Sequence, residues 1–377
     1  MVEPRDRPDS RRLSLVQRVI AVFAWCLVSM SCMGPQREAA PQAQRAAPRN
    51  ENVTVVVAVD GVRWQEIFGG VDSERARQLG LRPETARELL PNLYRLIDKH
   101  GCALGAPGSG TQVTASGPNF VSLPGYTEMF TGAAPVDCLD NECRRVRVPT
   151  VADEAALLQE SPAEVAVISS WRKIELAASH APEHLTISAG RSNGQNQSML
   201  RRHPDVWRAY QKGAAAKPAP GWGDFRPDRH TAEVAIGYLR HFRPRFLFVG
   251  LGETDEYAHH NDYRNYLAAL RQADRTVGEI YESLERAERA GATTLLLVTS
   301  DHGRYDFVHH GEEFPTSART WLVAAGSAVT ARGFVRSPSH RRLADLAPTI
   351  RALWGLEPEP GLDRDRRPGT VLTELFQ

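Results

Sequence analysis

Five short apolar runs constrain the fold of this chain more than any other feature. They are nearly continuous in Val, Leu, Ile, Ala and Phe, and they cover residues 52–60, 164–170, 245–251, 293–300 and 320–326. Strands that are apolar on both faces are typical of a parallel sheet covered by helices on both sides. Apolar residues at three- and four-residue spacing predict helices between the runs, at 91–101, 262–291 and 341–356. The alternation predicts an α/β fold with a central, mostly parallel sheet.

Composition and charge narrow the class of protein. The chain has 377 residues, of which 42% are hydrophobic and 24% charged, as in an ordinary globular enzyme. The chain has forty-six basic and forty-five acidic residues, so its formal net charge is only +1. Nothing in this balance indicates a nucleic acid partner, and the sequence predicts no oligomeric state.

The N-terminus reads as a targeting segment. Residues 1–18 are basic, and the apolar run at 19–32 is too short for a membrane span, so 1–32 resembles a secretion signal. Cys32 is a candidate for lipidation, with signal cleavage nearby or retention as an anchor as the alternatives. Residues 33–51 have the composition of a flexible tether. We therefore expect a folded domain at 52–377 outside the cytoplasm: in a bacterial periplasm, on a membrane as a lipoprotein, or secreted.

Cysteine usage leaves one pairing open. Cys138 and Cys143 are close enough to close a small disulfide loop, which an extracytoplasmic compartment would permit. Free thiols at both positions are the alternative, and Cys102 is left over in either case. No cysteine has the spacing of a zinc site.

Residues 180–232 differ from the rest of the predicted domain. They are polar and rich in Arg, Pro, Gly and Trp. We expect an insertion that lies over the site as a lid, outside the sheet, because such segments often set substrate choice.

Metal-ligand residues follow three of the apolar runs. The carboxyl ends of parallel strands meet at one edge of a sheet, which is where an open α/β sheet places its site. Carboxylate and imidazole ligands suit zinc or manganese, and two such sets beside one hydroxyl suit a two-metal hydrolase. The seven candidates are Asp60, Ser122, Asp255, His259, Asp301, His302 and His310.

Ser122 is the candidate nucleophile. Pro124 suits the first turn of a helix and Gly132 suits its end, so Ser122 is expected at the helix N-terminus. The free backbone N–H groups and the dipole there favour an oxyanion such as phosphate. Metal coordination could activate the serine without a histidine base. From this segment alone, a plain capping serine is the alternative.

The same segment resembles the nucleophile helix of the alkaline phosphatase superfamily. In the nucleotide pyrophosphatase/phosphodiesterase branch, a threonine precedes Phe-Pro-Asn and the helix closes with Thr-Gly. Four further motifs and a C-terminal helix resemble that branch in the same order across residues 53–350. The matching pieces are Ser122-Leu123-Pro124-Gly125 with Thr131-Gly132, the VDGVRW segment around Asp60, Asp255-x-x-x-His259, Asp301-His302-Gly303, His310-Gly311, and the helix ADLAPTIRALWGL.

The resemblance implies a fold and a set of roles. The fold would be a three-layer sandwich like that of alkaline phosphatase. Two divalent metal ions would lie about 4 Å apart, zinc being our first choice and manganese the second. His309 and His260 are adjacent competitors for His310 and His259, and the family spacing favours the latter pair. In this scheme Asp60, Asp301 and His302 hold one metal with Ser122 bound to it, and Asp255, His259 and His310 hold the other.

Departures from the family pattern limit the prediction of the substrate. Gly125 stands where the branch has an asparagine that touches a phosphoryl oxygen. Asn119 is a candidate substitute, with a turn residue as the alternative. Arg172 and Lys173 follow the run at 164–170 and could bind a phosphoryl group, or they could be surface charges.

Sulfatases and phosphoglycerate mutases are the nearest rivals within the superfamily. Ser122-x-Pro124 has the sulfatase spacing, but Tyr126 replaces its arginine, and Gly61 follows Asp60 where sulfatases tend to carry a second aspartate. The mutases share the metal set but are cytosolic and carry a second inserted domain. The predicted function is therefore hydrolysis of a small-molecule phosphoric monoester or diester through a covalent serine intermediate. The alternatives are a sulfuric ester hydrolase and a non-catalytic, metal-bound surface lipoprotein that acts as a binding module.

Overall fold

The computed structural model describes residues 52–192, 194–217, 220, 223–356 and 367–377. The expected signal at 1–32, with Cys32, and the expected tether at 33–51 lie outside the described residues. A search of the described helices for one long and apolar enough to cross a membrane finds none.

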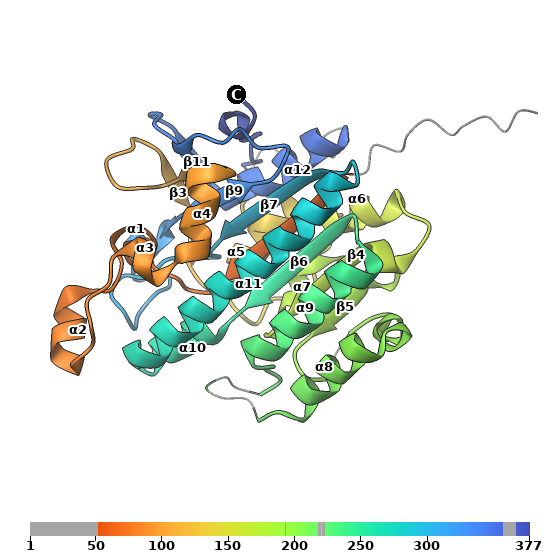
Figure 1. Ribbon diagram of the computed structural model, residues 1–377, viewed down its shortest axis with the longest axis horizontal. Helices are drawn as coiled ribbons and strands as arrows, with labels where there is room; N and C mark the ends of the chain where they lie inside the picture. Colours follow the sequence, from red (N-terminus) through yellow and green to blue (C-terminus); the bar gives the residue numbers. More distant parts are fainter. Residues whose placement is uncertain (1–51, 193, 218–219, 221–222, 357–366) are drawn as a thin grey trace, which may run out of the picture. The chain divides into compact units, whose positions relative to one another are not determined.

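An eight-stranded sheet forms the centre of the domain (Figure 1). Strand β9 runs antiparallel to both its neighbours, β7 and β2, and the other neighbouring pairs are parallel. The sheet is therefore mostly parallel, as the apolar runs predict. Its strands, in spatial order, are β10 (Gly333–Phe334), β2 (Gly101–Leu104), β9 (Leu322–Ala325), β7 (Thr293–Thr299), β1 (Asn52–Val59), β6 (Phe246–Leu251), β4 (Val165–Ser169) and β5 (Thr186–Ala189).

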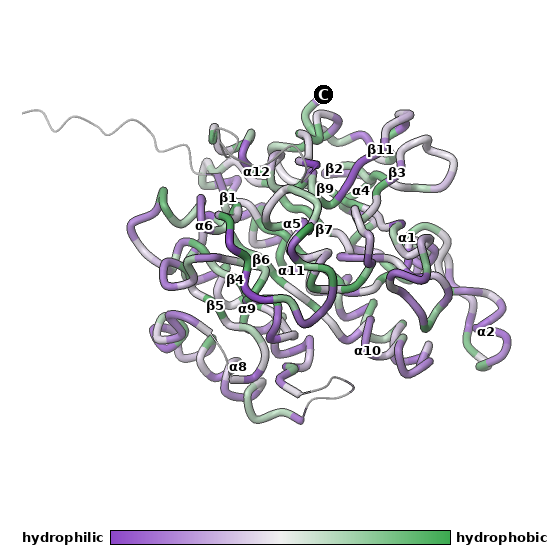
Figure 2. The backbone as a smooth tube through the Cα atoms, turned by 180° about the vertical axis from the view of Figure 1, so that it is seen from behind, coloured by the Kyte–Doolittle hydropathy of each residue, from purple (hydrophilic) through white to green (hydrophobic). Residues whose placement is uncertain are grey.

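Helices cover both faces of this sheet. Side chains alternate along a strand, so Val55 and Val57 of β1 enter one apolar core and Val56 and Ala58 enter the other. The first core packs against α4 (Pro91–Lys99), α9 (Asp228–Phe242) and α11 (Tyr263–Arg289), which lie in front of the sheet in Figure 1. The second packs against α5 (Ser122–Thr131), α6 (Val151–Leu157), α7 (Ile174–Ala178) and α12 (Leu346–Trp354). Figure 2 shows the sheet from that side, with hydrophobic segments along the inner strands. This confirms the expected layers.

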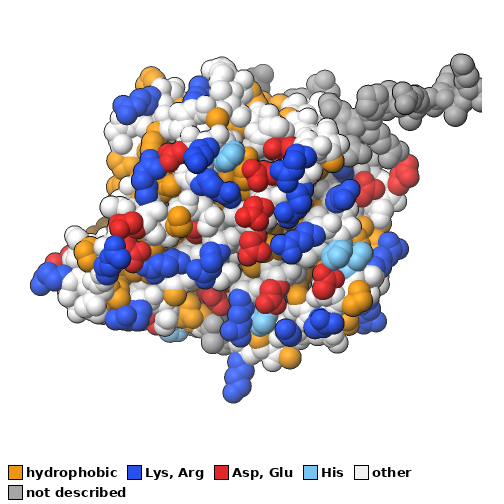
Figure 3. All heavy atoms as spheres, in the orientation of Figure 1, with side chains coloured by type: hydrophobic (Ala, Val, Ile, Leu, Met, Phe, Trp, Pro, Cys, Tyr) orange, Lys and Arg blue, Asp and Glu red, His pale blue; other side chains and the backbone are white. Residues whose placement is uncertain are grey.

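The remaining elements lie around this sandwich. A second sheet has the order β11 (His340–Arg342), β3 (Gln112–Thr114) and β8 (Arg319–Thr320). The other α-helices are α1 (Trp64–Gly69), α2 (Ser73–Leu79), α3 (Ala86–Leu89), α8 (Pro204–Ala215) and α10 (Glu253–His259). Short 3-10 helices occupy Pro162–Glu164, Pro182–His184, Gln197–Arg202, Pro315–Ala318, Leu343–Asp345 and Thr373–Leu375. Basic and acidic side chains are interspersed on the face shown in Figure 3, as the near-zero net charge suggests.

All five apolar runs form strands of the main sheet, but β2, β5 and β10 were not predicted. These three have only two to four residues each, too few to show a period. The expected lid at 180–232 is wrong in part, because β5 pairs with β4 inside the sheet and α9, which begins at Asp228, packs on it. Buried Arg226 explains some of the polar composition, since it donates to the carbonyl oxygens of Ser169 and Ser188 at the ends of these strands.

The two cysteines at 138 and 143 form a disulfide with an S–S distance of 2.19 Å. Cys102 is a buried free thiol in β2. The disulfide closes a small loop, residues 138–143, which lies beside the start of α5. That loop contributes contacts to the site described below.

Candidate active site

The site lies at the carboxyl ends of β1, β6 and β7. These three strands are adjacent, parallel and in register, with Val59 opposite Leu251 and Ala58 opposite Thr299. Asp60 directly follows β1, α10 follows β6 after one residue, and Asp301 comes two residues after β7. Residues that lie some 240 positions apart in the sequence therefore meet at one edge of the sheet.

The first group of side chains surrounds the hydroxyl of Ser122. One ligand atom from each of Asp60, Asp301 and His302 lies within 4.8 Å of the others, and all three residues are buried. Ser122 Oγ donates to Asp60 Oδ1 at 3.3 Å and lies 3.4 Å from His302 Nε2. Tyr126, one helical turn further along α5, donates its hydroxyl to Asp60 Oδ2 at 2.9 Å. Asp60 therefore holds both the serine and the tyrosine in place.

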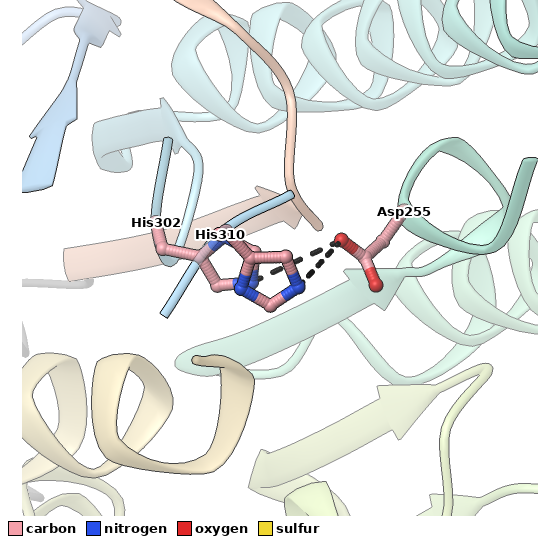
Figure 4. A group of neighbouring side chains, drawn as sticks. All are labelled: Asp255, His302 and His310. Atoms are coloured by element: carbon pink, nitrogen blue, oxygen red, sulfur yellow. Dashed lines mark ion pairs between the residues drawn. The ribbon is translucent and has the colours of Figure 1, made fainter. Parts of the chain in front are cut away.

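The second group contains Asp255, His302 and His310 (Figure 4). The Nε2 atoms of His302 and His310 lie 3.9 and 3.8 Å from Asp255 Oδ1. His259 adjoins this group, because its Nε2 lies 3.0 Å from Asp255 Oδ2 and 3.0 Å from His310 Nε2. The structure thus brings all seven predicted residues together. It also places His302 between the two groups, which the sequence did not predict.

The neighbouring histidines lie outside the cluster. His309 is exposed and its ring contacts Asp306 at 3.0 Å. His260, also exposed, contacts the carbonyl of Glu256 at 2.7 Å through Nδ1. This arrangement agrees with the preference for His310 and His259 over the residues beside them.

The two buried histidines are held as neutral acceptors. Nδ1 of His302 contacts the carbonyl of Gly303 at 2.9 Å, and Nδ1 of His310 contacts that of Phe120 at 2.8 Å. Because a carbonyl only accepts, each Nδ1 carries the proton and each Nε2 presents a lone pair to the cluster. Burial lowers the pKa of His302 to about 4 and that of His310 to about 3, which keeps both rings neutral.

The three carboxylates differ in their electrostatic surroundings. Burial and the Asp255 carboxylate raise the pKa of Asp301 to about 7. Burial, Asp301 and Asp255 raise the pKa of Asp60 well above its ordinary value. Burial is the largest single influence on Asp255 and acts in the same direction, but the guanidinium of Arg304 together with His259 and His310 holds the pKa of Asp255 well below its usual range. Within the part of the chain that the structure describes, Asp255 alone of these three carboxylates therefore pairs with an arginine or lysine.

Asp301 provides a test of whether these residues fit a metal ion. Its Oδ2 atom is buried and accepts no hydrogen bond from the residues that the structure describes. His302 Nε2, which presents a lone pair, lies 3.5 Å from this oxygen. A buried carboxylate oxygen facing a nitrogen lone pair is unfavourable unless a cation lies between them. The donor set therefore fits a divalent cation, and its ligand types suit zinc and manganese alike.

The start of α5 differs from the expected anion site. The N–H of Leu123 donates to Asn141 Oδ1 at 2.8 Å, and the N–H of Gly125 donates to Val121 O at 3.2 Å. Pro124 has no N–H group. The expectation of several free amide groups beside Ser122 is therefore wrong in part, because the N–H groups of Leu123 and Gly125 are both occupied. Asn141 has no sequence motif that could have revealed this contact.

Gly125 allows α5 to approach the loop after β7. A Cβ atom at this position would lie 2.3 Å from the carbonyl oxygen of Asp301. In this structure the position has no room for the asparagine that the phosphodiesterase branch carries. The close approach sets how near Ser122 lies to Asp301 and His302.

Two of the three predicted substrate-binding residues contact the disulfide loop 138–143. Asn119 donates its amide to Leu139 O at 2.8 Å. Lys173 Nζ donates to Asn141 O at 2.6 Å and to Glu142 at 2.5 Å. The third residue, Arg172, has a side chain that is 52% exposed and lies 3.8 Å from Glu175. The loop thus links Asn119 and Lys173 to the N-terminus of the helix that carries Ser122.

Parts of the chain are similar to a known protein family and to curated proteins. Residues 224–358 match the family model of the Metalloenzyme superfamily, and this segment contains five of the seven candidates. A 2,3-bisphosphoglycerate-independent phosphoglycerate mutase of Ruegeria sp. (strain TM1040) is 24% identical over 81% of this chain and 51% of its own. A phosphopentomutase of Desulfitobacterium hafniense is 30% identical over 34% of this chain and 31% of its own. The chain spans at most about half the length of the curated relatives it matches.

Solved structures resemble the whole domain. The alkaline phosphatase PafA aligns with a TM-score of 0.56 and 12% identity, over 88% of this chain and 100% of its own. The phosphonate monoester hydrolase of Agrobacterium radiobacter gives 0.54 and 14%, over 86% and 77%. A 2-O GAG sulfatase gives 0.51 and 12%, over 86% and 74%. At these identities the likeness shows the fold alone, an α/β fold like that of alkaline phosphatases and sulfatases, while the segment 224–358 resembles the Metalloenzyme superfamily.

Proposed function

We propose that this chain is a two-metal phosphoric ester hydrolase that acts through Ser122. The observation that carries the proposal is the position of the Ser122 hydroxyl, 3.3 Å from Asp60 Oδ1 and 3.4 Å from His302 Nε2. A serine held only as a helix cap would donate to, or accept from, the backbone of its own helix. This one instead points into a buried cluster of carboxylates and imidazoles that fits divalent cations.

The residues of the chain have distinct tasks in this reaction. Ser122 Oγ forms a bond to phosphorus as the bond to the leaving oxygen breaks, and its proton passes to Asp60 Oδ1, the acceptor of its hydrogen bond. The leaving group departs as an alcohol once it takes up that proton. Water then adds to phosphorus as the bond to Ser122 Oγ breaks, which restores the serine hydroxyl and releases phosphate from a monoester or a phosphomonoester from a diester. When bound, the metal ions would lower the pKa of the serine and stabilise charge on the leaving oxygen. Tyr126 fixes the Asp60 carboxylate through its second oxygen.

The proposed ligands follow the family spacing. Asp60, Asp301 and His302 would hold one metal beside Ser122, and Asp255, His259 and His310 would hold the other. Zinc remains our first choice and manganese the second. Asn119, Arg172 and Lys173 would contact the phosphoryl group. Two cationic side chains would favour a monoester, which carries more negative charge than a diester.

Two observations support a phosphate ester over a sulfate ester as the substrate. Tyr126 occupies the position of the sulfatase arginine, and it is engaged with Asp60. Gly61 has a φ of +60°, and a Cβ there would lie 2.3 Å from Asp255 Oδ1. A second aspartate after Asp60, as sulfatases tend to carry, is therefore not accommodated. Two of the relatives are named as mutases. Phosphoryl transfer between hydroxyls is therefore a further reaction to exclude.

We also propose that the protein acts outside the cytoplasm. The supporting features are the signal-like sequence at 1–32 and the disulfide between Cys138 and Cys143, which an oxidising compartment would preserve. Anchoring through a lipidated Cys32 belongs to the same proposal, and mass spectrometry of the mature N-terminus tests it.

Hydrolysis assays test the activity. The zinc-loaded and manganese-loaded protein is assayed on p-nitrophenyl phosphate, bis-p-nitrophenyl phosphate and p-nitrophenyl sulfate, beside Ser122→Ala. We expect serine-dependent turnover of one phosphate ester. Turnover of the sulfate ester alone would favour a sulfatase, and metal-loaded protein inert on all three would favour the binding module. Ser73→Ala is a matched control, because Ser73 also begins a helix but is exposed.

A further inference from the structure

Arg304 is buried within the loop that follows His302, and its side chain is 0% exposed. The guanidinium donates to the carbonyls of Gly61 at 3.1 Å, Val308 at 2.6 Å and Asp255 at 3.2 Å. It also forms an ion pair with Asp255 Oδ1. One side chain thus joins the segment after β1, helix α10 and the loop that leads to His310. No part of the proposed reaction uses it.

The oxygen that Arg304 binds is the one that faces the histidine pair. Asp255 Oδ1 lies 3.8 Å from His310 Nε2 and 3.9 Å from His302 Nε2. The other oxygen, Oδ2, lies 3.0 Å from His259 Nε2. A cation bound by Asp255 therefore either shares Oδ1 with the guanidinium of Arg304 or uses Oδ2, on the side of His259.

The two groups also differ in formal charge. Asp60 and Asp301 supply two carboxylates, and among the described residues neither forms an ion pair with an arginine or a lysine. The Asp255, His259 and His310 group supplies one carboxylate and two imidazoles. Arg304 balances that single carboxylate inside the protein, where solvent screening is weak.

We infer that Arg304 makes the two proposed metal positions unequal. The position formed by Asp60, Asp301 and His302 binds a divalent cation tightly. The position formed by Asp255, His259 and His310 binds one weakly, because the guanidinium cancels its carboxylate charge and occupies one of the two carboxylate oxygens. The inference rests on the proposed two-metal site, but it concerns metal binding and not turnover.

Arg304 is a positioning residue in this scheme. By holding Oδ1, it turns Oδ2 of Asp255 toward His259. The ligands of the weaker metal position are therefore already in place, but their net negative charge is small. The consequence is stepwise loading: the position beside Ser122 fills first, and the other fills at higher metal concentration.

Metal titration tests this inference without an activity assay. The full chain is stripped of metal and titrated with zinc against a chromophoric chelator, for the wild type, Arg304→Gln and Arg304→Lys. In the wild type we expect two binding steps that differ by about a hundredfold or more in affinity. Arg304→Gln removes the charge and is expected to tighten the weaker step by about tenfold or more. Arg304→Lys keeps the charge and should leave the weaker step weak.

Further measurements assign the steps and guard against misfolding. His259→Ala should abolish the weaker step alone, and circular dichroism with thermal melting shows whether each variant is folded. If Arg304→Gln does not fold, the wild-type titration and His259→Ala still decide whether the two metal positions are unequal and which of them is the weaker. Equal steps in the wild type, loss of the tight step in His259→Ala, or an unchanged gap in folded Arg304→Gln would each overturn the inference. Unequal steps in a protein that hydrolyses no ester would instead count against the proposed function alone.

Discussion

The two halves of the metal cluster use similar residues in opposite electrostatic settings. Around Ser122, two buried carboxylates form no ion pair with an arginine or lysine of the described residues, and the pKa of each is raised. Around His259, a single carboxylate is paired with Arg304 and its pKa is depressed. His259 is also 39% exposed, whereas His302 is 0% exposed. The ligand types alone therefore do not determine how strongly a position attracts a cation. The buried charges around the ligands do.

The largest expected effect comes from Ser122, which lies only in the first half. Ser122→Ala is expected to reduce turnover by at least about a thousandfold, because it removes the hydroxyl that is proposed to attack phosphorus. Bound metal should be retained, as measured by inductively coupled plasma mass spectrometry. Ser73→Ala should match the wild type. Undiminished turnover in Ser122→Ala would break the assignment of chemistry to the first half.

The next effect compares the halves directly. Asp301→Asn is expected to weaken the tight zinc step by about a hundredfold, since it removes an unbalanced buried charge. Asp255→Asn should leave the tight step within roughly tenfold of the wild type and lose the weak step, because it removes the one carboxylate of that half and leaves the Arg304 charge unbalanced. Chelator competition measures both. Equal losses of the tight step in the two variants would show that the halves are electrostatically alike.

The raised pKa of Asp301 also makes a pH-dependent prediction for the metal-free protein. The ordinary value is 3.8 and the folded value about 7, so between these the unfolded chain releases a proton that the folded one keeps. Rising pH through this window therefore favours unfolding. Above about pH 7 the protonated Asp301 no longer contributes to folding stability. His302 and His310 have depressed pKa values and act in the opposite sense, so the informative quantity is a difference.

That difference is the melting temperature of Asp301→Asn minus that of the wild type, both measured in excess chelator. It should increase from pH 4 to pH 7 and then level off. A difference that stays constant with pH would show that Asp301 is ionised throughout. Adding zinc at pH 8 should reverse the order, since the wild type gains more from metal.

A smaller effect concerns the backbone support of the first half. In Gly125→Ala the new Cβ meets the carbonyl of Asp301 at 2.3 Å, so helix α5 must move away from the loop after β7. We expect a destabilisation of about 1–3 kcal/mol and a weaker tight step. Gly69→Ala is the control, because a Cβ there meets nothing within 4 Å. Urea unfolding measures both, and equal stabilities would show that α5 tolerates the shift.

The smallest effect is expected outside both halves. Lys173→Ala should raise KM for the monoester by about tenfold or less and change the diester little, since the proposed contact is to the extra phosphoryl charge. Arg77→Ala, on exposed α2, serves as the control. An equal effect on both esters would assign Lys173 to the disulfide loop, where it contacts Asn141 and Glu142.

Much of the fold could be predicted, because a strand buried on both faces leaves a visible apolar run. The short strand β5 left no such run, and its neighbour Arg226 made the segment look like a surface insertion. Antiparallel β9 has the same apolar character as its parallel neighbours, so its direction was not visible in the sequence. The pattern of burial was predictable, but strand direction depends on the connections between strands.

The sequence by itself determined which chemistry is available and where it sits along each strand. Asp60, Asp301 and His302 directly follow buried runs, and parallel strands bring such positions to one edge. Only the tertiary structure decided the partners: His302 lies between the groups, Asn141 occupies the amide beside Ser122, and Arg304 pairs with Asp255. The physical reason is range. Burial is recorded locally in each segment, whereas an ion pair between residues 49 positions apart depends on angles and distances that only packing defines.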